Sequence, residues 1–345
     1  MDMAGMIEAY NSEKELPFSG AVYVREEDGG IFEQAYGYAN RSEQTKNQTN
    51  TRFGVASGCK IFTAVAIGQL VEKGLLLFDT RLNECLPIRF PFFDPDITVH
   101  QLLTHSSGIP DYFDEETMSD YAELWRSVPM YAMTSPSCFL PLFQNERMKF
   151  APGSRFSYSN AGFIVLGLIV EQLAGIGFTE YVQTHIFQAC GMNDSGYFWL
   201  DRLPERTATG YINDGYNWKT NIFSLPVVGG PDGGAYTTVQ DLATFWEALL
   251  GNRLLSASIT HTMLLPHRRV SEELSYGYGV WISTPGDGIF KYYVMGGDPG
   301  VNMQSSVYAE SGIQAHVITN TSTGAGSLAA RIDKAIWQRM QSSGT

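Results

Sequence analysis

Residues 53–67 read Phe53-Gly-Val-Ala-Ser57-Gly-Cys-Lys60-Ile-Phe-Thr-Ala-Val-Ala-Ile67, which places a serine three positions before a lysine at the start of an apolar run. Residues three apart share one face of a helix, so the Lys60 amine is within reach of the Ser57 hydroxyl. A serine attacks a carbonyl at neutral pH only when a neighbouring base or cation activates it. The N-terminal end of a helix also favours a developing alkoxide. The pair predicts an activated nucleophile, although random order gives about 0.6 S-x-x-K matches in 345 residues.

Composition and charge restrict the class of protein. A chain of 345 residues with 44% hydrophobic and 13% aromatic content can bury one large core or two smaller ones. The net charge of −13 repels a phosphate backbone, and the sequence shows no basic run with interleaved aromatic residues. These features predict a globular protein that does not bind nucleic acid.

The sequence shows no pattern typical of a membrane span or a secretion signal. A span needs about 18–20 uninterrupted apolar residues, and the longest apolar segment, 161–173, is interrupted by Gly167 and Glu171. The first ten residues lack a basic start, an apolar stretch and a small-residue cleavage site. We therefore expect a cytoplasmic protein with no membrane contact. A longer precursor would change the expected location.

The cysteines and histidines show no spacing typical of metal or redox sites. Cys59, Cys85, Cys138 and Cys190 are widely separated and form no C-x-x-C pair. The six histidines are scattered without H-x-x-x-H spacing. We expect reduced thiols, no metal and no cofactor. Cys59 is one step along the helix from the lysine and should point away from the Ser/Lys face.

Periodicity and turn signals predict a sheet whose strands come from both ends of the chain. Strands lie on either side of Asp28-Gly-Gly, which is a hairpin signal. The helix that contains the serine ends at Lys73-Gly74, which is typical of a basic last turn and a glycine after the helix. The elements expected in this first part are a helix over 3–15, strands over 20–25 and 31–38, and a helix over 57–73.

The middle of the chain has mainly helical periodicity and the last third returns to strands. Pro, Gly and Asp-rich loops separate the helical patterns of the middle region. Thr237 or Thr238 is the expected N-cap of a helix over 239–250. The expected helices are 99–104, 121–125, 161–173, 178–187 and 327–340, and the expected later strands are 277–283, 288–294, 301–308 and 313–319.

These elements predict an α+β fold. Residues 1–76 and 226–345 would form a discontinuous domain with an antiparallel sheet flanked by the N- and C-terminal helices. Residues 77–225 would form an inserted, mainly helical domain, with a cleft between the two.

A candidate partner for the serine is Tyr158 in Pro152-Gly-Ser-Arg-Phe-Ser-Tyr158-Ser-Asn160-Ala-Gly162. Y-x-N triplets also occur at 38–40 and 211–213, so the triplet alone selects nothing. The Pro-Gly turn and the loop before a strongly apolar helix would hold Tyr158 where it can face the serine. The alternative is a packed aromatic residue beside a helix that Asn160 caps.

Several segments in order resemble the serine β-lactamase-like family, which includes class C β-lactamases, penicillin-binding DD-peptidases and β-lactamase-fold esterases. The resemblance covers nearly the whole chain, and ordered matches are more specific than any one motif. The matching segments are 53–64 with S-x-x-K, 97–111 with Thr-His-Ser-Ser-Gly, 152–162 with Y-x-N, 233–243, and 296–300 with Gly-Gly-Asp-Pro-Gly.

The resemblance implies a role for each motif residue. Ser57 would be the nucleophile that accepts the acyl group, and Lys60 and Tyr158 would relay protons. Asn160 would hydrogen-bond the Lys60 amine or a substrate amide oxygen. The backbone N–H groups of Ser57 and Gly297 would hold the oxyanion that forms during attack.

The third motif departs from the family pattern. Gly296 and Gly297 suit a strand that substrate approaches closely, although a bulge or tight turn would also explain them. The family usually has a Lys or His before this pair that binds a substrate carboxylate, and the aligned position is Val294, with Met295 next. This change favours neutral esters or amides over β-lactams. It is also compatible with a catalytically weak or silent binding protein.

The sequence therefore predicts a serine hydrolase that acts through an acyl-enzyme on an ester, amide or β-lactam. The alternative is a silent binding protein on the same fold. The partner would be a small-molecule or peptide-like acyl substrate, and the sequence leaves the oligomeric state open. His105 is expected to satisfy backbone groups near a helix end at Gly108. Asp232 and Asp241 are expected to be a turn residue and a first-turn helix acid.

Overall fold

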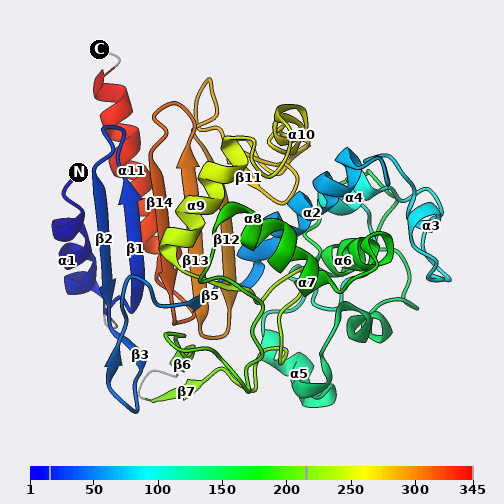
Figure 1. Cartoon of the computed structure of the whole chain (residues 1–345), viewed down its shortest axis with the longest axis horizontal. Helices are drawn as coiled ribbons and strands as arrows, with labels where there is room; N and C mark the ends of the chain where they lie inside the picture. Colours follow the sequence, from blue (N-terminus) through cyan, green and yellow to red (C-terminus); the bar gives the residue numbers. More distant parts are fainter. Residues whose placement is uncertain (15–16, 214–216, 344–345) are drawn as a thin grey trace.

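The computed structural model describes residues 1–14, 17–213 and 217–343, and its centre is one antiparallel sheet (Figure 1). Eight strands follow the order β2-β1-β14-β13-β12-β11-β10-β9, so strands from both ends of the chain meet in the middle of the sheet. This arrangement confirms the expected α+β fold with a discontinuous sheet. The strands are β1 Gly20–Arg25, β2 Ile31–Tyr36, β9 Arg268–Arg269, β10 Leu274–Tyr276, β11 Trp281–Ser283, β12 Lys291–Asp298, β13 Val301–Tyr308 and β14 Gln314–Thr319.

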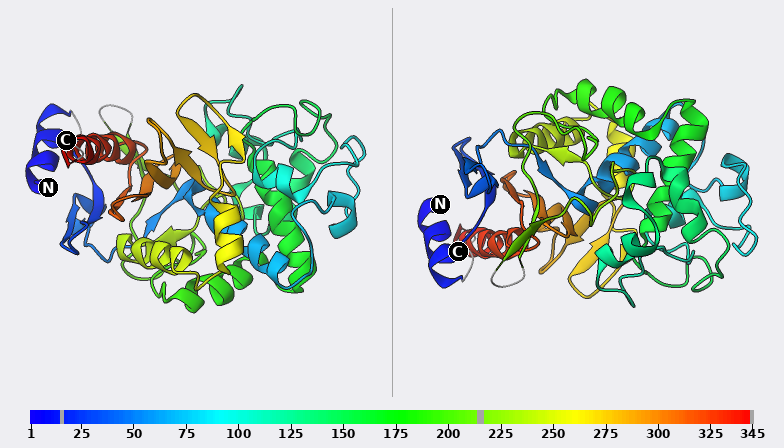
Figure 2. Two further views of the ribbon diagram at one scale, coloured as in Figure 1. Left: turned by 90° about the horizontal axis from the view of Figure 1, so that it is seen from above. Right: turned by 90° about the horizontal axis from the view of Figure 1, so that it is seen from below.

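Strand side chains point alternately to the two faces of the sheet, and each face has its own core. In β1, Ala21 and Tyr23 join the larger core, whereas Val22 and Val24 join the smaller one. The smaller core lies under α1 (Met3–Glu13) and α11 (Ala325–Ser343), which lie beside each other at one end of the molecule (Figures 1 and 2). Helix α9 (Val239–Leu250) packs on β1 and β14 from the other face. The N- and C-terminal helices therefore flank the sheet as expected.

The helical region is at the end of the molecule opposite the two termini (Figure 2). It is continuous with the larger core, which joins Phe163 of α6 with Ala21 of β1 and Val294 of β12. The division into domains 1–76 with 226–345 and 77–225 stays a prediction. The helices in and around this region are α2 Lys60–Glu72, α3 Leu82–Cys85, α4 Val99–Leu103, α5 Leu124–Ser127, α6 Asn160–Ala174, α7 Phe178–Val182, α8 Gln188–Cys190 and α10 Ala257–Met263.

Shorter elements complete the chain. The 3-10 helices are Ala56–Cys59, Tyr121–Glu123, Met130–Ala132 and Pro136–Leu142, and Gln183–Phe187 is a π-helix. The small strands are β3 Tyr38–Asn40, β4 Thr45–Lys46, β5 Phe53–Gly54, β6 Tyr211–Asn213, β7 Trp218–Thr220 and β8 Tyr236–Thr237.

Several expected elements differ in detail from the structure. The helix expected over 121–125 is a 3-10 turn that leads into α5, and the helix expected over 178–187 is α7 followed by a π-helix. The strand expected over 277–283 is a turn followed by β11, because Gly279 has a φ of +70° and the Gly277 N–H donates to the Val280 carbonyl at 2.8 Å. The helix expected over 57–73 begins instead as the 3-10 turn Ala56–Cys59. The last residue of the helix expected over 3–15 lies outside the described residues.

The expected C-terminal end of α2 and the expected N-cap of α9 are confirmed. Gly74, after α2, has a φ of +69° and donates its N–H to the Val71 carbonyl at 2.9 Å. Thr238 is the N-cap of α9, because its hydroxyl accepts the Asp241 N–H at 3.1 Å.

Among the described residues, no single helix has the length and apolar character of a membrane span. Only α6 together with the segment Phe178–Cys190 passes that test, and these two are bent by 77°.

Candidate active site

Ser57 lies on the 3-10 turn that joins β5 to α2. Ala56, just before it, has a φ of +47°, a left-handed conformation that costs energy for a residue other than glycine and that recurs at functional sites. Side chains three apart in a 3-10 helix are eclipsed, so the turn aligns Ser57 with Lys60 more directly than an α-helix does. This local geometry replaces the first α-helical turn that the sequence predicts.

Lys60 is the first residue of α2, and it is 1% exposed. Its Nζ donates to Ser57 Oγ at 3.0 Å, to Asn160 Oδ1 at 2.8 Å and to the Asp232 carbonyl at 2.6 Å. The three N–H groups of an ammonium therefore each have an acceptor. The acceptors come from three separate segments of the chain, so the buried cation holds these segments together.

Tyr158 lies in the loop before α6, where the sequence places it, and its ring is near the same ammonium. Lys60 Nζ is 4.9 Å from the ring centroid. Burial raises the pKa of Tyr158 well above its ordinary value and the charge of Glu115 adds to this rise, whereas a hydrogen bond with the Ser57 side chain opposes it. The phenol form is therefore favoured at rest, and its hydroxyl is in contact with the proposed nucleophile.

Asn160 is held at the first position of α6 by groups that the sequence analysis did not identify. The helix cap is Ser159, whose Oγ accepts the Gly162 N–H at 3.0 Å, so the alternative of Asn160 as the cap is wrong. The Asp111 carboxylate accepts the backbone N–H groups of Asn160 at 2.7 Å and Ala161 at 2.9 Å. This leaves the Asn160 side chain free to bind Lys60. Asp111 is the last residue of the segment 97–111 that resembles the family, and this position in a matching segment is the one feature of the sequence that could have identified it.

The Gly-rich loop 229–234 provides the third acceptor for the Lys60 ammonium. Asp232 is a turn residue as expected, but its backbone carbonyl binds Lys60 and its carboxylate accepts the Tyr112 hydroxyl. The hydroxyl of Thr63, one turn further along α2, donates to the Pro231 carbonyl at 2.6 Å. Helix α2 therefore fixes the loop at two adjacent points.

The three residues of the third motif occupy different environments. Strand β12 packs against the Ser57 turn, and a Cβ at Gly296 would lie 2.1 Å from the Val55 carbonyl oxygen and 3.0 Å from Ser57 N. Only glycine fits at this contact. Gly297 lines the cavity, whereas Val294 is 4% exposed and belongs to the larger core.

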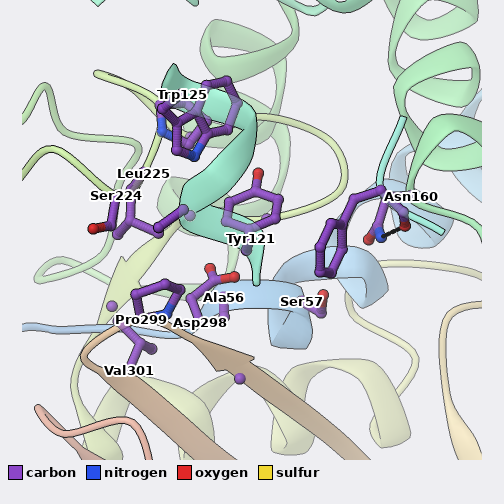
Figure 3. A pocket seen from close by; sticks show the side chains of 18 of the residues that line it. Ala56, Ser57, Tyr121, Trp125, Asn160, Ser224, Leu225, Asp298, Pro299 and Val301 are labelled. Atoms are coloured by element: carbon purple, nitrogen blue, oxygen red, sulfur yellow. Dashed lines mark hydrogen bonds between the residues drawn. The ribbon is translucent and has the colours of Figure 1, made fainter. Parts of the chain in front are cut away.

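A cavity of about 940 Å³ opens in front of Ser57. Figure 3 shows Ser57 between Asn160 on one side and Asp298 on the other, with Tyr121 and Trp125 of the helical region facing them. Aromatic and apolar side chains form much of the wall. They include Tyr112, Phe113, Tyr121, Trp125, Phe139, Phe198, Leu200, Phe223, Leu225 and Tyr236.

Carboxylates dominate the charged groups near the nucleophile. The carboxylates Glu115, Asp120, Asp232 and Asp298 line the cavity, together with the cations Arg126 and Lys219. Burial raises the pKa of Asp298 to about 7, and the charges of Asp232 and Glu115 contribute to that rise, whereas Lys60 opposes it. Burial also raises the pKa of Asp232. Asp298 is therefore largely ionised only above about pH 7, where its negative charge adds to that of the other cavity carboxylates.

Two other side chains considered in the sequence analysis, those of Cys59 and Asp241, make structural contacts outside the Ser57–Lys60 pair. Cys59 points toward the Gly230 carbonyl, 3.7 Å from its Sγ, and burial raises the pKa of its thiol to about 11. The Asp241 carboxylate in the first turn of α9 accepts the Ser195 hydroxyl at 2.7 Å, as expected of a structural acid. Among the described residues, no group of three or more His, Cys, Asp or Glu side chains could hold a metal ion.

The structure thus brings Ser57, Lys60, Tyr158 and Asn160 into contact and places Gly297 on the same cavity. A serine hydroxyl that is hydrogen-bonded to a lysine, with a tyrosine beside the pair, in an accessible cavity has the geometry for acyl transfer. The individual roles assigned to these residues stay predictions.

Comparisons with known proteins identify the family of this chain. The chain belongs to the Beta-lactamase family, which matches residues 7–336. It is 30% identical over 281 residues to Penicillin-binding protein 4* of Bacillus subtilis, covering 77% of this chain and 59% of that protein. The chain therefore spans less than two thirds of that relative.

Solved structures agree with this assignment. A penicillin-binding protein from Bacillus halodurans is 47% identical, with a TM-score of 0.91 over 96% of this chain and 99% of that one. A D-stereospecific amidohydrolase from Streptomyces sp. is 22% identical, with a TM-score of 0.76 over 93% of this chain and 95% of that one, and shares the fold.

We expect Gly296→Ala to lower the free energy of unfolding by about 1–3 kcal/mol, which is typical of overpacking. The added Cβ would meet backbone atoms of Val55 and Ser57 that move only if the nucleophile moves. Gly297→Ala is the matched control, because its nearest neighbour is Asn302 Nδ2 at 3.8 Å. Denaturant unfolding of both variants measures the difference, and equal losses would contradict this account of the packing.

We expect Asp298→Asn to raise the melting temperature at pH 8 more than at pH 4.5. The folded pKa of about 7 lies above the ordinary 3.8, so ionising this carboxyl opposes folding. The penalty is absent well below pH 4, grows between about pH 4 and pH 7, and is complete above pH 7. Thermal melts across this range measure it, with the exposed Asp287→Asn as control. An increase that is the same at every pH would rule out the raised pKa.

Proposed function

We propose that this chain is a serine hydrolase that forms an acyl-enzyme on Ser57. The observation that carries the proposal is the contact between the buried Lys60 ammonium and Ser57 Oγ at 3.0 Å, with Tyr158 on the same hydroxyl. Nothing in ordinary core packing calls for a serine, a lysine and a tyrosine at the floor of an open cavity. The relatives named penicillin-binding proteins support an acyl-accepting serine.

The reaction would take place in two halves. Before attack the Lys60–Tyr158 pair loses one proton to solvent, leaving a neutral amine or a phenolate beside Ser57. Ser57 Oγ then attacks the substrate carbonyl carbon as its proton passes to this deprotonated pair, and the backbone N–H groups of Ser57 and Gly297 bind the resulting oxyanion. The carbon–leaving group bond then breaks, and the leaving group takes a proton from the same pair. In the second half water attacks the acyl-enzyme, its proton follows the same route, and the acid product leaves Ser57.

The charges around the cavity support a substrate without a carboxylate. Position 294, where relatives have Lys or His, holds a buried valine that offers no cation. Four carboxylates, Glu115, Asp120, Asp232 and Asp298, line the same space and outnumber the two cations there, Arg126 and Lys219. Two like charges about 8 Å apart repel by about 2 kcal/mol at an effective dielectric constant of about 20. Neutral esters and amides of small-molecule or peptide-like acids therefore suit the site better than β-lactams.

The second candidate is a binding protein without catalytic activity, which the same valine supports. Its distinguishing result would be a folded wild type that releases no 4-nitrophenol and gains no acyl group on Ser57. Val294→His or Val294→Lys would not restore a cation to the cavity, because position 294 lies in the core. The hydrogen bonds that join Ser57, Lys60 and Asn160 favour the hydrolase. The cytoplasmic location remains part of the proposal.

We expect Ser57→Ala to lower the release of 4-nitrophenol from 4-nitrophenyl butyrate by about 10³-fold or more, because the nucleophile is lost. Mass spectrometry should find a butyryl group on Ser57 of the wild type. Ser258→Ala, at an exposed position on α10, is the control. Equal release by wild type and Ser57→Ala would refute the acyl-enzyme. The same incubation with a fluorescent penicillin separates ester from β-lactam specificity.

We expect kcat/KM at pH 8 to be at least about tenfold higher for 4-nitrophenyl butyrate than for mono-4-nitrophenyl succinate. The two esters have the same chain length, but the succinate has a carboxylate that the cavity carboxylates would repel. The ratio should fall in Asp298→Asn, which removes one of these charges. Faster turnover of the succinate would contradict the proposed preference, whatever the role of Ser57.

A further inference from the structure

His105 terminates α4 at a position where glycine is usual. It has a φ of +54°, its N–H donates to the Leu102 carbonyl at 3.3 Å, and the Ser106 N–H donates to the Gln101 carbonyl at 2.9 Å. This pair of bonds ends many helices with a left-handed glycine. The residue that terminates α4 is therefore His105, three residues before the expected Gly108. A glycine at position 105 would make the same two backbone hydrogen bonds. The side chain of His105 needs another explanation.

The side chain and carbonyl of His105 hold both neighbours of Tyr158. Its carbonyl accepts the Ser157 N–H at 2.8 Å, and its Nδ1 accepts the Ser159 N–H at 3.0 Å. The left-handed backbone turns both acceptors toward the same loop. Because this stretch of the loop belongs to no helix or strand, these two bonds fix a backbone that no regular hydrogen-bond ladder supports.

The imidazole ring also contacts the Tyr158 ring. The two centroids are 4.2 Å apart with an angle of 34° between the planes. Trp281 stacks on Tyr158 at 6.2 Å and 9°, and Tyr276 contacts both the histidine and the tryptophan at 4.7 Å. The Nδ1 acceptor role places the proton on Nε2, which has no hydrogen-bond partner among the described residues. Burial and the Lys60 charge keep the pKa of His105 well below its ordinary value.

We propose that His105 is a positioning residue that sets the place of Tyr158 beside Ser57. It acts as a neutral ring that accepts one backbone N–H and packs on the tyrosine. The inference rests on the proposed proton-relay role of Tyr158. His105 takes no proton from substrate and is not among the described residues that line the cavity.

Three variants separate the possible roles. His105→Gly keeps the left-handed helix end and removes both the acceptor and the ring. His105→Asn also tolerates the left-handed backbone, and its Oδ1 can replace Nδ1 as the acceptor of the Ser159 N–H. His105→Phe keeps an aromatic ring and removes the acceptor. Thermal melts establish which variants are folded.

The first readout is the single-turnover acylation rate with 4-nitrophenyl butyrate. We expect His105→Gly to lose at least tenfold in this rate with less than a threefold change in KM, because the cavity itself is unaltered. His105→Asn should recover part of the loss, and His105→Phe should not. A folded His105→Gly with the wild-type rate, or no recovery in His105→Asn, would overturn the inference.

The second readout does not depend on activity. Crystal structures of the glycine and asparagine variants should show Tyr158 displaced from Ser57 in the first and in place in the second. An unmoved Tyr158 in His105→Gly would overturn the inference even if the wild type proved to be silent. A silent wild type with the expected displacement would contradict the proposed hydrolase and leave the positioning role of His105 supported.

Discussion

The burial of the Lys60 ammonium is the constraint on which the rest of the structure depends. A charge removed from water is tolerated only when its donors are satisfied. Here the acceptors are the Ser57 hydroxyl, the Asn160 amide oxygen and the Asp232 carbonyl. Asp232 is more than 170 residues from Lys60 along the chain. The lysine can therefore be buried only if the sheet, α6 and the Gly-rich loop 229–234 assemble around α2. The residues that hydrogen-bond the buried ammonium are therefore the same residues that form the candidate active site.

The surroundings of that cation are organised in layers. Ser57, Asn160 and Asp232 contact the ammonium, and a second set of groups fixes those three. The Asp111 carboxylate binds the first backbone N–H groups of α6, and Tyr112 binds the Asp232 carboxylate. The left-handed Ala56 and the glycine at 296 let β12 approach the serine turn. This support explains how a nucleophile on a short 3-10 turn can have a defined position.

Much of this site could be predicted because its parts are local in sequence. Ser57 and Lys60 are three residues apart, and Tyr158 and Asn160 share one loop, so each pair is visible as a short motif. The order of several such motifs along the chain then singles them out from chance matches. The partners of those pairs could not be predicted in the same way. Asp111 reads as an ordinary turn residue after a proline, and the use of the Asp232 backbone carbonyl depends on no side chain at all. The sequence predicts strand at 277–280, where the structure has a turn, because alternating tyrosines and glycines fit both conformations.

Local chemistry in the sequence therefore determined the α+β class, the order of strands and helices, the helix ends at Gly74 and Thr238, and the identity of the reactive groups. Tertiary structure decided which of those groups meet. It also gave His105 its contact with Tyr158, buried Val294 in the core, and collected four carboxylates around one cavity. The physical reason is that backbone propensity and side-chain periodicity act over a few residues, whereas burial, charge compensation and close approach depend on segments that only the folded chain brings together.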